Sequence, residues 1–105
     1  NDPTFVEAAR RLAENAMLAE SDDRKRVVHL YRRLMGRAPK AAEIDVLLSL
    51  QRAQAGAFKA DRGAAERLVS VGESAREGSL NISDLAAWTM VASAILNLDE
   101  TVTKG

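Results

Sequence analysis

The residues of this chain that could do chemistry are few and scattered. His29 is the only histidine and there is no cysteine, which excludes a thiolate zinc site, a thiol nucleophile and thioether attachment of haem. His29 also stands among Lys25, Arg32 and Arg33, whose positive charge disfavours both protonation and metal binding. We therefore expect no metal and no cofactor to bind to this chain.

Pairs of carboxylates invite an acid–base interpretation that their sequence neighbours do not support. The pairs are Glu43 with Asp45, Asp22 with Asp23, and Asp99 with Glu100. None stands in an apolar setting, which would be needed to separate two carboxyl pKa values for catalysis. No serine has the glycine-flanked setting of a nucleophile, and no glycine-rich loop could cradle a phosphate. We expect helix caps and surface charge here, and no catalytic residue.

The strongest local charge lies between residues 24 and 40, which hold seven basic residues and no acidic one. They are Arg24, Lys25, Arg26, Arg32, Arg33, Arg37 and Lys40. Two predicted helices and a short break in this region could form a helix-turn-helix that binds phosphates. The second helix begins with acidic Glu43 and Asp45, which would repel phosphates. A solvated helix face is the preferred interpretation, and the alternatives are a nucleic-acid interface, an acidic protein partner or a neighbouring domain of the same chain.

An uncharged run at residues 85–98 marks the centre of the fold. It contains Trp88, the only tryptophan, in a chain where 29% of residues are charged. A helix that is apolar nearly all round must be enclosed by others. The run is shorter than the roughly 20 residues that cross a bilayer, so we expect a buried core helix and no membrane span. We expect a carbonyl of the loop at 72–81 to accept the indole N–H.

Hydrophobic spacing predicts further helices at about residues 3–20, 23–36, 40–60 and 64–71. Asp2 should cap the first, Gly36 should end the second in a left-handed conformation, and Asn81 or Ser83 should cap the last. The loop at 73–81 is the best candidate for mobility. The fold class is therefore all-α: residues 1–105 form a single compact bundle of about five helices, with a mostly buried C-terminal helix.

Five short motifs occur in a recognisable order. They are residues 1–10 (NDPTFVEAAR), residues 34–39 with Glu43, residues 71–74, residues 85–89 and residues 96–101. Over nearly the whole chain they resemble the uncharacterised C-terminal domain of large secreted, cytochrome c-containing proteins typical of planctomycetes and related bacteria. The resemblance implies a periplasmic or secreted setting and haem c in another domain. Lys40 departs from the family, which often has Thr or Ser there, so the third helix should have a weaker cap.

Three hypotheses for function follow. The first is a non-catalytic accessory or docking module that contacts other domains of the same parent chain, or a protein partner, through an exposed apolar patch. The absence of an initiating methionine fits a fragment of a larger multidomain protein. The second is an enzymatic or ligand-binding domain with a pocket near Trp88, under the 73–81 loop and bordered by Glu73 and Asp84. The third is nucleic-acid binding through residues 24–40, which the balance of fifteen basic and fifteen acidic residues disfavours.

Overall fold

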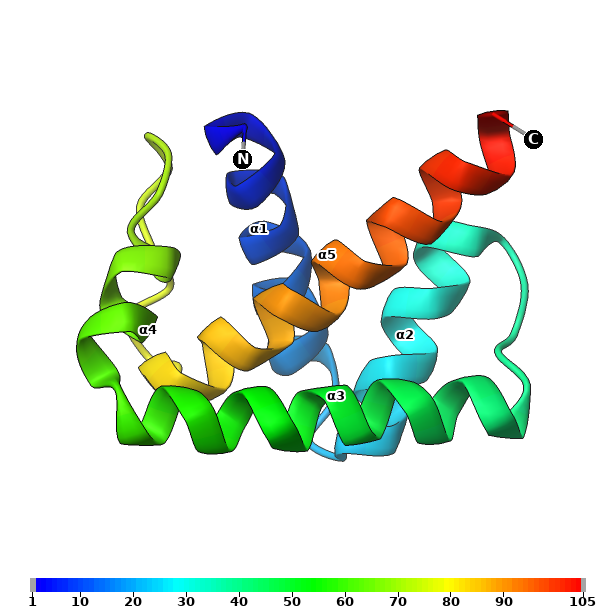
Figure 1. The fold of residues 1–105 in the computed structure, drawn as a ribbon, viewed down its shortest axis with the longest axis horizontal. Helices are drawn as coiled ribbons and strands as arrows, with labels where there is room; N and C mark the ends of the chain where they lie inside the picture. The colour runs from blue at the N-terminus through cyan, green and yellow to red at the C-terminus, as the bar shows by residue number, and fades with distance from the viewer. Residues whose placement is uncertain (1, 105) are drawn as a thin grey trace.

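The computed structural model describes the backbone of residues 2–104 and the side chains of residues 2–98. Within these residues the chain forms five helices and no strand, which confirms the predicted all-α class. The helices are α1 (Pro3–Ala19), α2 (Asp23–Met35), α3 (Ala41–Ala60), α4 (Arg62–Val69) and α5 (Ile82–Lys104). In Figure 1, α5 crosses the bundle diagonally, and α3 runs along its lower edge.

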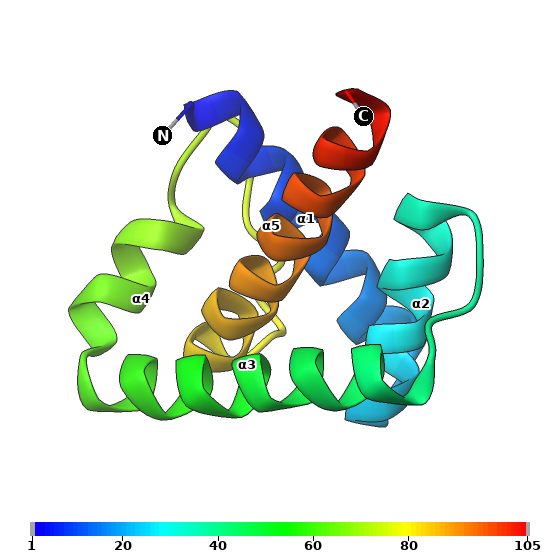
Figure 2. The same ribbon diagram turned by 45° about the vertical axis from the view of Figure 1, so that its right-hand side comes forward.

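The central helix is α5, as the uncharged run predicted. It is in contact with each of the other four helices, which surround it in Figures 1 and 2. Trp88, Val91 and Ile95 have no exposed surface. Because each large apolar side chain contributes about 1.5–3 kcal/mol when it is fully buried, this helix supplies much of the driving force for the fold.

Short polar side chains begin the helices where the sequence predicted. Asp2, Asp22 and Asn81 each accept a hydrogen bond from a backbone N–H two or three residues later. Ser83, the alternative cap for α5, is instead buried and donates its hydroxyl to the carbonyl of Phe58 at 3.4 Å. Asn81 is therefore the N-cap of α5.

The bounds of α4 differ from the predicted 64–71. The helix begins at Arg62 because the carboxylate of Asp61 accepts the N–H of Ala64 at 3.1 Å, and it ends at Val69. The prediction was wrong by two residues at each end, since it overlooked Asp61 as a cap. Gly36 ends α2 at φ 75°, in the left-handed conformation that the sequence predicted.

The predicted hydrogen bond between the Trp88 indole and the loop at 72–81 is wrong. The indole nitrogen is buried and has no hydrogen-bond partner among the described residues. Arg10 donates instead to the loop carbonyls of Ser74 at 2.8 Å and Ala75 at 3.4 Å. A guanidinium combines a charge with five N–H donors, so it competes for these carbonyls better than a single indole N–H does.

Candidate functional site

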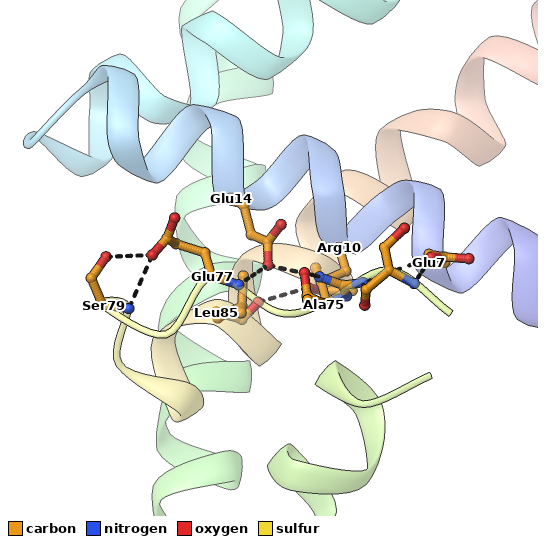
Figure 3. Close-up of polar contacts among 9 residues, drawn as sticks. Glu7, Arg10, Glu14, Ala75, Glu77, Ser79 and Leu85 are labelled. Atoms are coloured by element: carbon orange, nitrogen blue, oxygen red, sulfur yellow. Dashed lines mark hydrogen bonds and ion pairs between the residues drawn. The ribbon is translucent and has the colours of Figure 1, made fainter. Parts of the chain in front are cut away.

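Three charged residues of α1 hold the loop between α4 and α5 (Figure 3). Glu7, Arg10 and Glu14 lie one helical turn apart on one face of α1, and we call them the loop clamp. The Arg10 side chain is only 1% exposed, and it donates to the carboxylate of Glu14 at 2.8 Å. A buried charge of this kind requires paired partners. The two terminal nitrogens of Arg10 have them, whereas its buried Nε has no hydrogen-bond partner among the described residues.

The loop clamp also engages the backbone N–H groups of the loop. Glu7 accepts the N–H of Ser74 at 2.6 Å, and Glu14 accepts the N–H of Glu77 at 2.9 Å. Hydrogen bonds from the side chain and the backbone of Ser74 lower the pKa of Glu7. With the two bonds from Arg10, four hydrogen bonds tie α1 to the loop that the sequence marked as the best candidate for mobility.

Gly72 lets the loop pass close to the clamp. Its φ is 94°, and a Cβ at this position would meet the side chain of Glu7. Glycine is needed here both for the left-handed backbone and for the close approach. The clamp was missed from the sequence because arginine is usually exposed. The available signal was the 7, 10, 14 spacing of Glu, Arg and Glu on one helix face.

In the described part of the chain the loop lines a hollow of about 600 Å³ against Arg11, Glu14 and Leu18 of α1, but Trp88 does not lie at its floor. This side chain is completely buried, so it cannot floor an open cavity. Glu73 is exposed on the loop. Asp84 is half-buried in the first turn of α5, where its backbone N–H donates to the side-chain oxygen of Asn81 at 3.0 Å. A bound molecule would reach Trp88 only if the core opened.

The seven basic residues of segment 24–40 do not form one free surface. Arg26 donates to the carbonyls of Met17 and Glu20 at the end of α1, and Arg24 lies 3.9 Å from Asp45. Arg37 is 48% exposed and is paired with Glu43. The remaining members are also exposed, and they are Lys25, Arg32, Arg33 and Lys40. Asp45 and Glu43 of α3 thus lie beside basic residues of this segment, where their negative charge would repel phosphates.

His29 is half-buried beside a shallow hollow of about 360 Å³. The hollow is also lined by Glu20, Lys25, Val28 and Arg32. The Nε2 atom of His29 is buried without a hydrogen-bond partner among the described residues. Among residues 2–98, whose side chains the structure describes, no group of three or more His, Asp or Glu side chains is placed to hold a metal ion.

A second cluster, the turn clamp, joins α2 to the start of α3. It consists of Tyr31, Arg37 and Glu43. The Tyr31 hydroxyl donates to Glu43 at 2.7 Å and accepts from Arg37 at 2.6 Å, while Arg37 donates to Glu43 at 3.0 Å. Glu43 also accepts the N–H of Lys40 at 2.7 Å, so it satisfies the helix start that the Lys40 side chain leaves uncapped.

The turn clamp shifts the pKa values of its members. The hydrogen bond from Arg37, followed by those from the Lys40 N–H and the Tyr31 hydroxyl, holds the pKa of Glu43 far below its ordinary value. Burial, and then the bond to Glu43, raise the pKa of Tyr31. Glu43 is therefore an ionised structural anchor at neutral pH and has no proton to donate in a reaction.

An apolar groove of about 250 Å³ opens beside the turn clamp, between α2, α3 and α5. It is lined by Tyr31, Ala42, Glu43, Val46, Leu47 and Leu98. Val46 is 68% exposed and Leu98 is 48% exposed, although both are large and apolar. Exposed apolar groups gathered in a groove are typical of interaction sites.

The groove continues into an uncharged helix surface, which we call the outer face of α3. Its members are all exposed, and they are Ala42, Val46, Ser49, Ala53, Gly56 and Ala60. Residues on the opposite side of the helix, such as Ile44, Gln51 and Ala55, are buried in the core. Figures 1 and 2 both show α3 along the edge of the molecule. Within the described part of the chain, the outer face is therefore not covered by another helix.

No protein-family model, curated protein or solved structure matches this chain. Among the described residues, no helix combines the length and the apolar character needed to cross a membrane. The candidate site is accordingly the groove together with the outer face of α3, and it rests on the geometry of the molecule.

Proposed function

We propose that this domain is a non-catalytic helical docking module of a larger exported protein, in which another domain carries haem c. The exported setting and the haem domain rest on the resemblance of the five sequence motifs. The docking role rests on the physical character of the surface. The module would bind other domains of the same parent chain through the groove beside Val46 and Leu98.

The observation that carries the docking role is the exposure of Val46 and Leu98 in one apolar groove. Leaving such side chains in water forgoes about 25 cal/mol for each Å² of apolar surface that a partner would cover. The polar clusters offer no comparable case for catalysis. The charged atoms of the loop clamp form hydrogen bonds to a loop, and those of the turn clamp form hydrogen bonds to each other and to the start of α3.

The test is binding of this chain to the separately produced remaining domains of its parent protein. Val46→Glu should abolish co-purification, because a carboxylate would be desolvated in the groove. Leu18→Glu is the matched control: Leu18 is 57% exposed on α1, away from the groove, so this variant should bind as the unchanged chain does.

Three outcomes would count against the proposal. If the unchanged chain does not bind the remaining domains at all, the docking role is wrong. If Val46→Glu binds as tightly as the unchanged chain while its helical content is preserved, docking uses another surface. A parent gene product without a Cys-x-x-Cys-His motif would remove the haem-containing setting.

A further inference from the structure

The outer face of α3 has the spacing of a helix that pairs with another helix. Its six members, from Ala42 to Ala60, follow one another at alternating intervals of four and three residues. Any stripe along one side of an α-helix has this spacing, and in a coiled coil it is the spacing of the positions that face a partner helix. At 1.5 Å per residue, the 20 residues of α3 provide a surface about 30 Å long.

We infer that this face receives a second copy of the same chain, with the two α3 helices antiparallel about a two-fold axis between Ser49 and Ala53. The inference goes beyond the proposed function: it gives the outer face of α3 a partner of its own, and this face shares Ala42 and Val46 with the groove. In this arrangement Ser49 lies opposite Ala53 of the second copy, and Ala42 lies opposite Ala60 of the second copy. A self-complementary two-fold contact is the commonest form of protein self-association.

The sizes of the side chains fit the antiparallel arrangement. Val46, the largest member of the face, lies opposite Gly56 of the second copy. A Cβ placed on Gly56 would have no heavy atom within 4 Å, so the space above it is open to the valine. A parallel pair would instead set Val46 against Val46 and leave Gly56 opposite Gly56, with a gap at that layer.

The charges beside the face also fit this arrangement. Asp45, Arg52 and Lys59 lie on one flank of the outer face, and the two-fold axis brings this flank against the same flank of the second copy. Asp45 then lies near Lys59 of the second copy, and the contact occurs twice. The two Arg52 side chains approach the axis, but both are exposed and can diverge into water. On the other flank, Leu50 meets Leu50.

The association should depend on concentration. One pair of helices covers less than the roughly 1,600 Å² of a standard stable interface. We therefore expect sedimentation to show monomers and dimers in exchange between about 1 µM and about 1 mM chain, the range of weak complexes. A chain that stays monomeric throughout this range would overturn the inference.

Substitution at the centre of the face tests its position. Ala53→Glu should raise the dimer dissociation constant at least about tenfold, because two carboxylates would meet near the axis. Ala8→Glu makes the same change at an exposed position of α1 and should leave the dimer unchanged. Circular dichroism should show equal helical content in both variants. A dimer that is insensitive to Ala53→Glu would overturn the inference.

Charge exchange tests the flank. Asp45→Lys should weaken the dimer several-fold, since it sets two lysines against each other. Adding Lys59→Asp to the same chain should restore the dimer, because the pairs are re-formed with the charges exchanged. If the double variant dimerises no better than Asp45→Lys alone, the antiparallel arrangement is wrong.

Disulfide trapping tests whether the two α3 helices run antiparallel or parallel. The natural chain has no cysteine, so only the introduced cysteines can form a disulfide. Ser49→Cys and Ala53→Cys chains, mixed and oxidised, should form the mixed 49–53 disulfide. A parallel pair would favour 49–49 and 53–53 disulfides, and this result would overturn the inference. The proposed function fails separately: a monomeric chain that binds the parent domains in a Val46-dependent manner keeps the docking role and removes the dimer.

Discussion

The loop clamp and the turn clamp use the same chemistry at different depths. Each sets an arginine against carboxylates to hold a segment outside the helices. The side chain of Arg10 is 1% exposed, however, whereas that of Arg37 is 48% exposed. Water can replace the partners of Arg37 but not those of Arg10. The buried clamp should therefore contribute far more to folding, although the more exposed clamp contains the strongly shifted carboxylate.

Arg10→Met should have the largest effect on stability. The substitution keeps an unbranched apolar side chain but leaves Glu14 and two loop carbonyls without their donor. Removal of one member of a buried charged cluster costs about 3–5 kcal/mol, out of the 5–15 kcal/mol typical of a domain. Urea unfolding of the variant measures this loss.

Arg11→Met is the matched control for the buried arginine. Arg11 is the next residue of α1 and is exposed, so its loss should change the unfolding free energy by less than about 0.5 kcal/mol. If Arg10→Met and Arg11→Met lower the unfolding free energy equally, the burial of Arg10 does not add to stability. Arg37→Met should fall between them, closer to Arg11→Met.

Gly72→Ala should have an intermediate effect. The alanine must adopt φ near 94° and would displace the Glu7 side chain from its contact with Ser74. A left-handed non-glycine residue costs about 1–3 kcal/mol. Gly78→Ala is the control, since a Cβ there meets no atom within 4 Å and its φ is not left-handed. If Gly72→Ala unfolds at the same urea concentration as Gly78→Ala, the loop does not depend on this close approach.

Sequence reasoning identified the elements but not the clusters that join them. Trp88 in the buried part of α5 and Gly36 at the end of α2 were predictable, because an uncharged run and a glycine stop act locally. The burial of Arg10 was not predictable, because it depends on a loop more than sixty residues away. The groove likewise exists only where Val46 and Leu98 meet in three dimensions. The outer face of α3 was not identified from the sequence, because its small side chains give no hydrophobic signal, and its exposure is seen only in the structure.

Acid should weaken the turn clamp, which is the smallest of the expected effects. The ordinary pKa of Glu43 is 4.5 and its folded value lies well below this. Between these two values the unfolded chain takes up a proton that the folded chain does not. The clamp therefore stabilises the fold fully above about pH 4.5, and this contribution is lost as the pH falls toward the folded pKa.

Glu43→Gln separates this contribution from those of other carboxylates. The variant should be less stable than the unchanged chain at pH 7, and its stability should fall less steeply below pH 4.5, because glutamine takes up no proton. Glu7→Gln provides the comparison within the loop clamp, since the pKa of Glu7 is also lowered. Urea unfolding between pH 7 and about pH 3 gives both curves. If the curve for Glu43→Gln runs parallel to that of the unchanged chain in acid, Arg37 and its neighbours do not hold this carboxylate in its ionised form.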